Sequence, residues 1–125
     1  MRGFHVVFML FAVGCAPVCP PGLERAASVD LYFGRGGVSD ADWRDFVDRS
    51  VVPRFPDGMT VFDAGGSWRD PRTGRTSSED SKVLRLIVPD ARVAAPATLA
   101  IIDEYKRRFA QQSVLRVEQP VCHAF

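Results

Sequence analysis

The residues best suited to chemistry are polar side chains near predicted strand ends and turns. Arg54 is suited to bind a carboxylate through two parallel hydrogen bonds, and Glu79 with Lys82 could form a proton-transfer pair. A structural role explains these residues at least as well, because Arg and Asp around a Pro-Asp-Gly turn commonly hold the loop. We therefore expect no catalytic residues. The polar and aromatic residues that could meet at one edge of the sheet are Tyr32, Arg35, Arg54, Asp57, Trp68, Glu79 and Lys82.

The histidines and glycines add no catalytic or cofactor motif. Only two histidines exist; His5 lies in a segment that we expect to be removed, and His123 lies in the last three residues. We therefore expect no catalytic Ser-His-Asp or Cys-His arrangement. The segment Gly34-Arg35-Gly36-Gly37 lacks the Walker lysine and the dinucleotide spacing, so it predicts a turn and no bound cofactor.

The N-terminal segment has the features of an export signal. Arg2 precedes a short apolar run up to Val13, too short to span a membrane, and the run ends at Gly14-Cys15. The segment Leu10-Phe11-Ala12-Val13-Gly14-Cys15 resembles the lipobox of bacterial lipoproteins, which implies that Cys15 carries a diacylglyceryl group and anchors the chain to a membrane surface. The alternative is ordinary cleavage followed by periplasmic or secreted release.

The cysteine count is consistent with lipidation. Three cysteines are an odd number for an exported protein, and lipidating Cys15 leaves Cys19 and Cys122 as a pair that could form a disulfide. Two unpaired cysteines in mobile tails are an alternative. A zinc site of Cys15, Cys19, Cys122 and His123 is less suitable, because adjacent ligands such as Cys122-His123 fit one tetrahedral ion poorly. We expect no metal.

Length and charge limit the class of protein. The 125 residues allow one domain, and 46% hydrophobic with 25% charged residues is typical of a globular chain. The 16 Lys and Arg residues balance 15 Asp and Glu residues. Binding to nucleic acid is not expected, because it requires basic residues gathered on one face.

The order of elements predicts an α+β fold of the ferredoxin-like βαββαβ type, with a four-stranded antiparallel sheet and two helices on one face. We expect a signal peptide over 1–14, a tether over 15–27 and a single domain over 28–125. Strands are predicted at 29–33, 59–64, 82–88 and 113–121, with a bulge or kink at Gly65-Gly66. A helix over 40–52 is followed later by a second helix with Pro96 in its first turn, and its expected buried residues are Leu99, Ile101, Ile102, Tyr105 and Phe109.

The alternation within the strands assigns two faces to the sheet. The face under the helices is predicted to hold Val29, Leu31, Phe33, Leu84, Leu86, Val88, Leu115 and Val117. The open face then holds Asp30, Tyr32, Val83, Arg85, Ile87, Arg116 and Glu118. Ion pairs of Asp30 with Arg85 or Arg116 would explain its charges, whereas Val83 and Ile87 favour a homodimer through this face.

Several segments also resemble a known bacterial family, the domain of unknown function family 3574. The matching segments are Tyr32-Phe33-Gly34-Arg35, Trp43 with Phe46, Pro53-Arg54-Phe55-Pro56-Asp57-Gly58 with Thr60, Trp68, Glu79 with Ser81-Lys82, Tyr105 with Phe109, and Gln112-Ser113-Val114-Leu115. They occur in order over essentially the whole domain. The resemblance implies membership of an uncharacterised family and assigns no activity.

Two functions are consistent with these observations. The first is a lipid-anchored, non-enzymatic binding or interaction module of the cell envelope, whose ligand the sequence does not indicate. The second is a small cofactor-free enzyme of the dimeric α/β-barrel type, similar to oxygenases or isomerases, with Tyr32, Arg54, Glu79 and Tyr105 lining a cavity.

Overall fold

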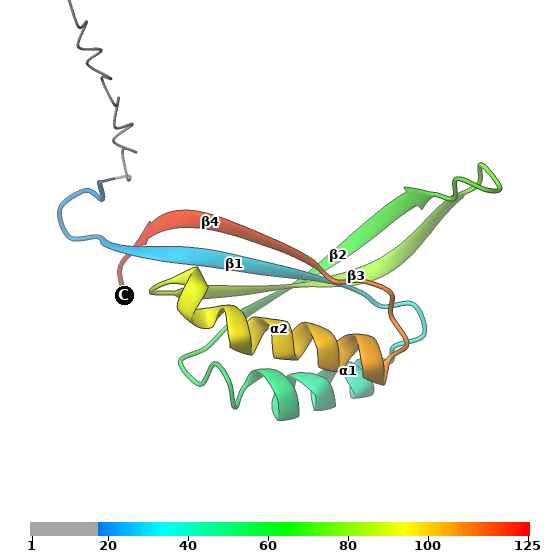
Figure 1. The fold of residues 1–125 in the computed structure, drawn as a ribbon, viewed down its shortest axis with the longest axis horizontal. Helices are drawn as coiled ribbons and strands as arrows, with labels where there is room; N and C mark the ends of the chain where they lie inside the picture. Colours follow the sequence, from blue (N-terminus) through cyan, green and yellow to red (C-terminus); the bar gives the residue numbers. More distant parts are fainter. Residues whose placement is uncertain (1–17) are drawn as a thin grey trace, which may run out of the picture.

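The computed structural model describes residues 18–125, and the predicted signal peptide and Cys15 lie outside this range. Within these residues the chain forms seven elements, of which Figure 1 labels the four strands and the helices α1 and α2. They are β1 (Glu24–Gly34), α1 (Asp40–Phe46), η1 (Val47–Val51), β2 (Thr60–Arg69), β3 (Thr76–Val88), α2 (Ala91–Arg108) and β4 (Leu115–His123).

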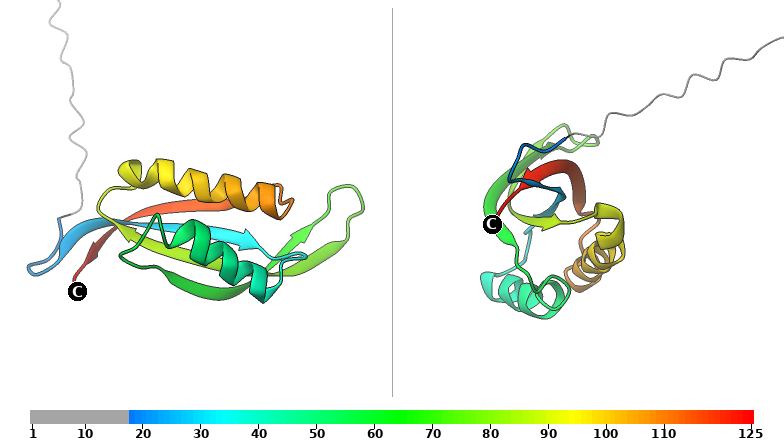
Figure 2. Two further views of the ribbon diagram at one scale, coloured as in Figure 1. Left: turned by 90° about the horizontal axis from the view of Figure 1, so that it is seen from below. Right: turned by 90° about the vertical axis from the view of Figure 1, so that its left-hand side faces the viewer.

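The four strands form one antiparallel sheet in the spatial order β2-β3-β1-β4. Both helices cover the same face of this sheet, and the opposite face is left open (Figure 2). The far half of the β2–β3 hairpin extends beyond the helices (Figure 1). This arrangement confirms the ferredoxin-like prediction.

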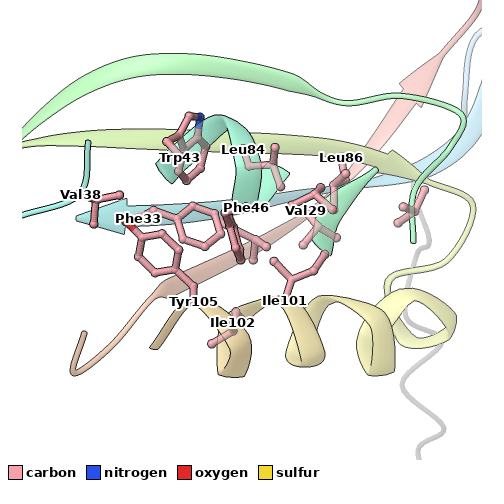
Figure 3. Packing of buried hydrophobic residues seen from close by; sticks show 13 residues of the cluster. Val29, Phe33, Val38, Trp43, Phe46, Leu84, Leu86, Ile101, Ile102 and Tyr105 are labelled. Carbon is pink, nitrogen blue, oxygen red and sulfur yellow. The ribbon is translucent and has the colours of Figure 1, made fainter. Parts of the chain in front are cut away.

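The core lies between the helices and the sheet (Figure 3). Val29, Leu31 and Phe33 alternate along β1 and are fully buried, as the period of a strand requires. Phe33 packs edge-on against Trp43, Phe46 and Tyr105 from the helices, with ring centroids 4.7–5.9 Å apart. Full burial of each large apolar side chain contributes on the order of 1.5–3 kcal/mol, so this filled layer stabilises the fold.

The first helical segment covers the predicted span, but its last turn is wider than that of an α-helix. Ser39 caps its start, because the Ser39 hydroxyl accepts a hydrogen bond from the Asp42 amide at 3.1 Å. From Val47 the hydrogen bonds switch to the π pattern, and the Val52 amide bonds to the Val47 carbonyl at 3.0 Å. The wider turn was not predicted, because no residue type specifies it.

Three strands are longer than the sequence patterns indicate, and β3 begins at Thr76 rather than at Lys82. Strand β1 begins at Glu24, inside the segment expected to be a tether, because its first residues pair with β4 as far as Glu24 opposite His123. Strand β2 continues to Arg69 through Gly65-Gly66, with unbroken pairs to Asp80 and Glu79. The predicted bulge is wrong, since the partner strand β3 supplies a regular ladder across both glycines.

The second helix starts earlier than predicted. Asp90 caps it by accepting a hydrogen bond from the Arg92 amide at 2.8 Å, so Pro96 lies inside the helix rather than in its first turn. Tyr105, Ile102 and Ile101 are buried as expected, and Thr98 joins them. Leu99 is 51% exposed, because the buried stripe runs through Thr98 and Ile101 and places Leu99 outside it.

The prediction of which residues of the last strand point toward the helices is wrong by one residue. In the observed register Leu31 lies opposite Arg116 and Asp30 opposite Val117. Leu115 and Val117 therefore belong to the open face, while Arg116 and Glu118 belong to the helix side. Arg116 accordingly contacts Glu118 and donates a hydrogen bond to the Ala91 carbonyl of α2.

A disulfide joins Cys19 to Cys122, as predicted, with their Cα atoms 5.6 Å apart. The antiparallel pairing of β1 with β4 brings the two ends of the domain together at this point. Neither sulfur is then available as a thiolate ligand, which removes the alternative zinc site. Across residues 18–125, no helix combines the length and apolar character needed to cross a membrane.

Candidate functional site

Three of the candidate residues line one cleft at the hairpin end of the open face. The cleft has a volume of about 570 Å³, within the range of small-molecule sites. Its walls come from β1, β2, β3, the start of β4 and the segment that joins α2 to β4. The lining residues are Tyr32, Gly34, Trp68, Glu79, Ala110, Gln111, Gln112, Ser113 and Leu115.

Glu79 lies directly over the end of β1 because two glycines leave room for its carboxylate. A Cβ atom at Gly34 would lie 2.6 Å from Glu79 Oε1, and one at Gly36 would lie 3.0 Å from Oε2. Any larger residue at Gly34 would therefore displace the carboxylate. Within residues 18–125, Glu79 itself forms no ion pair.

Tyr105 supports this cleft from below rather than lining a cavity. Its side chain is fully buried, and its hydroxyl donates a hydrogen bond to the Gly34 carbonyl at 2.7 Å. Burial raises the pKa of Tyr105 to about 12, so the phenol stays protonated at neutral pH. The expectation that Tyr105 could line an enzymatic cavity is not met, since its ring fills the core.

Arg35 follows Gly34 but turns toward the helix α1. Its guanidinium donates to the Val38 carbonyl at 2.9 Å and lies 2.7 Å from an Asp40 carboxylate oxygen. The hydrogen bond from Arg35 holds the pKa of Asp40 below its usual value. The Arg35 Nε atom is buried without a hydrogen-bond partner in the described part of the chain. Arg35 therefore fixes the turn between β1 and α1.

Lys82 and Glu79 do not form the proton-transfer pair that the sequence suggested. They are three residues apart in β3, so their side chains point to opposite faces. Lys82 instead forms an ion pair with Asp63 of β2, its direct cross-strand neighbour.

Arg54 lies at the opposite end of the molecule from the cleft residues. It donates to the Ser50 carbonyl at 2.6 Å and lies 3.8 Å from Glu104 of α2. The buried Ser50 hydroxyl donates to the same Glu104 carboxylate at 2.5 Å. These contacts tie η1 to α2. Ser50 and Glu104 were not predicted, because no local sequence pattern pairs residues of two different helices.

A second concavity of about 480 Å³ lies on the open face near the end of β4. Asp57, Arg85, Ile87, His123 and Phe125 are among the residues that line it. No polar groups of complementary chemistry converge there, because Arg85 is already paired with Asp30. We therefore place the candidate site at the Glu79 cleft.

The middle of the open face holds the predicted ion pair between Asp30 and Arg85. Arg85 donates two hydrogen bonds to the Asp30 carboxylate at 2.8 and 2.6 Å, and the Ser28 hydroxyl donates a third. The Asp30 side chain is only 9% exposed. The hydrogen bonds from Arg85 hold the pKa of Asp30 below its usual value although burial acts in the opposite direction.

Among the described residues, no three His, Cys, Asp or Glu side chains are placed to hold a metal ion. The chemistry that the cleft offers is therefore that of one carboxylate, two aromatic rings and several amide and hydroxyl groups.

The fold and the site belong to an α+β protein of the ferredoxin-like class. Residues 28–125 match the family described as protein of unknown function DUF3574, and the chain belongs to that family. This confirms the resemblance carried by its sequence segments. A comparison with curated proteins finds no match.

Two solved structures share the fold. A phage SAM lyase in complex with S-methyl-5'-thioadenosine is 16% identical, with a TM-score of 0.57 over 80% of this chain and 90% of that chain. The same phage enzyme class in the apo state is 15% identical, with a TM-score of 0.56 over 81% and 90% of the two chains. At this identity the likeness is one of fold alone.

Proposed function

We propose that the protein is an exported, lipid-anchored module of the cell envelope that acts by binding through the open face of its sheet. The observation that carries this proposal is the composition of that face. Five large side chains are exposed on it, whereas the helix-covered face is a filled core. The five residues are Tyr32, Phe62, Trp68, Ile87 and Leu115.

A second copy of the chain is the partner that this face suits. The Asp30 and Arg85 charges at its centre neutralise each other within one chain, so two such faces can meet without like-charge repulsion. A two-fold contact brings the same patch of both copies together, and an apolar patch complements itself. A dimer through the part of this face around Phe62 and Ile87 would bury apolar side chains that the monomer leaves in water, and it would leave the cleft lined by Tyr32, Trp68 and Leu115 accessible.

The anchor and the export route rest on two further observations. The Cys19–Cys122 disulfide supports an oxidising compartment, in which such bonds persist. The sequence has three cysteines, so the disulfide between two of them leaves the thiol of Cys15 for lipidation.

The rival function, a cofactor-free enzyme, needs Tyr32, Arg54, Glu79 and Tyr105 around one cavity. Tyr32 and Glu79 share a cleft, but Arg54 is engaged with Ser50 and Tyr105 is engaged with Gly34. This separation favours binding over catalysis.

Sedimentation velocity of the full-length chain tests the dimer. We expect a dimer for the native chain and a monomer for Ile87→Asp, because a charge would be buried in the contact. Val93→Asp is the matched control, since Val93 is 80% exposed on α2 and lies in the other layer. A native chain that remains monomeric at all concentrations would refute the homodimer.

Intact mass spectrometry of the protein taken from its native envelope tests the anchor. We expect the mass of a chain that starts at Cys15 and carries a diacylglyceryl group. A mature chain without that adduct would show that the protein is exported without a lipid anchor.

A further inference from the structure

We infer that the Glu79 cleft is a binding site for a small organic cation of the alkylammonium class. The inference rests on the proposed binding function and names a ligand for the hairpin end of the same face. The first observation that supports it is the charge of the residues that line the cleft. Of the nine residues that line the cleft, Glu79 is the only charged one, so the cleft carries a single negative charge.

The second support is that, within residues 18–125, no basic side chain forms an ion pair with Glu79. Lys82 lies three residues further along β3 and Arg35 directly follows Gly34, and both form ion pairs with other residues. Lys82 pairs with Asp63 on the helix side of the sheet, and Arg35 pairs with Asp40. The Glu79 carboxylate therefore keeps its full capacity to accept hydrogen bonds and positive charge from a ligand.

The third support is the position of the Glu79 carboxylate beside Gly34 and Gly36. Gly34 and Gly36 leave the space into which Glu79 folds, and a Cβ at Gly34 would lie 2.6 Å from Glu79 Oε1. The Tyr105 hydroxyl in turn holds the Gly34 carbonyl. The carboxylate thus lies against the backbone of Gly34 in the cleft and, because Glu79 is exposed, it is accessible to a ligand from solvent.

The fourth support is the aromatic wall. Tyr32 and Trp68 line the same cleft as Glu79 and are both exposed. The face of an aromatic ring attracts a cation, and a carboxylate beside two rings is a combination that recognises ammonium groups. Gln112 and Ser113 on the opposite wall offer hydrogen bonds to a polar substituent of the ligand. A neutral or anionic ligand would leave the carboxylate unpaired.

Titration of the full-length chain with choline and ethanolamine, followed by NMR, tests the inference. The neutral isostere 3,3-dimethylbutan-1-ol serves as the ligand control. The two tryptophans report separately, because Trp68 lines the cleft and Trp43 is buried in the core. We expect choline or ethanolamine to shift the Trp68 indole N–H signal saturably while that of Trp43 stays in place, and we expect the isostere to bind about tenfold more weakly or not at all.

Two variants complete the test. Glu79→Gln keeps the shape of the side chain and should raise the dissociation constant of the cation about tenfold. Asp80→Asn removes a carboxylate from the adjacent residue of β3, which faces the other side of the sheet, and should leave binding unchanged. The inference is overturned if neither cation shifts Trp68, if the isostere binds as well as choline, or if Glu79→Gln binds both cations like the native chain. Because the dimer and the anchor are measured separately, such a result would leave the proposed binding module standing without this ligand.

Discussion

Tyr105 of α2 donates a hydrogen bond of 2.7 Å to the carbonyl oxygen of Gly34, 71 residues away at the end of β1. The bond crosses from the helix layer to the sheet at the point where Glu79 lies over Gly34. It therefore links the packing of the core to the floor of the cleft.

Tyr105→Phe is expected to lower the free energy of unfolding by about 1–2 kcal/mol, because the ring packing remains and one buried hydrogen bond is lost. Urea denaturation measures the change. Tyr32→Phe is the matched control, since Tyr32 is exposed on the open face, and it should leave the midpoint unchanged. If the two variants are equally stable, the Tyr105 hydroxyl does not stabilise the fold.

The disulfide closes a loop of 103 residues between Cys19 and Cys122. In the chain-entropy model, closing a loop of this size stabilises the folded state by about 4–5 kcal/mol. The double variant Cys19→Ser, Cys122→Ser should therefore unfold at a clearly lower urea concentration. Reductant should bring the native chain to the same midpoint and should not affect the variant. Equal midpoints without reductant would show that the disulfide does not constrain the unfolded chain.

The sequence was sufficient to predict the ferredoxin-like order and the cysteine pairing, because topology alone brings the start of β1 beside the end of β4. The face of β4 was not predictable in the same way. The alternation of Leu115 and Val117 with Arg116 and Glu118 favours the apolar pair on the helix side, whereas the strand that follows the turn after α2 pairs with β1 so that the charged pair lies there. That turn contains Ala110 with φ 52°, a conformation that its residue type does not indicate.

Part of the candidate site could be predicted from the sequence for a similar reason. Glu79, Trp68 and Tyr32 were recognisable as polar or aromatic residues near strand ends, and pairing across β1, β2 and β3 brings them together. The grouping of Arg54 and Lys82 with them was wrong, because Lys82 points to the helix side of the sheet and Arg54 lies at the other end of the molecule against Ser50 and Glu104. The role of Gly34 could be recognised only from the cross-strand register, because Glu79, which occupies the space next to its missing Cβ atom, lies 45 residues further along the chain.

Asp30 is expected to make the stability of the protein sensitive to acid. Its folded-state pKa lies below the usual 3.8, so the ionised form stabilises the fold above that pH. This contribution is lost as the pH falls through the lower folded-state value. Asp30→Asn should therefore be less stable at neutral pH and should show a smaller loss of stability between neutral and acidic pH. Thermal unfolding over a pH series measures both effects.

Asp45 provides the comparison for this pH series. Arg108 and Arg49 also hold its pKa below the usual value, but Arg49 is largely exposed and Asp45 partly so. At about 1 M salt the screening length falls to roughly 3 Å, so exposed ion pairs weaken most. The effect of Asp45→Asn should nearly vanish in high salt, whereas that of Asp30→Asn should persist. Equal salt dependence would show that Asp30 is no better shielded from solvent than Asp45.

Ala110 occupies the position at the end of α2 where glycine is usual. The Gln111 amide bonds to the Lys106 carbonyl at 3.1 Å, the pattern of a helix end whose intervening residue is left-handed, and Ala110 has φ 52°. A residue with a Cβ pays about 1–2 kcal/mol in this conformation, while glycine adds about 0.5–1 kcal/mol of entropy to the unfolded chain. Ala110→Gly should therefore raise the free energy of unfolding by about 0.5–1 kcal/mol.

A larger side chain at position 110 tests the same backbone conformation in the opposite direction. Ala110→Val adds a branched side chain to the left-handed residue and should destabilise the protein more than Ala110→Gly stabilises it. Urea denaturation of both variants beside the native chain gives the two differences. If both variants are less stable than the native chain, Ala110 is held by contacts that its backbone conformation does not explain. The order Gly, Ala, Val from most to least stable would show that the left-handed turn at Ala110 is a strained element of the cleft wall.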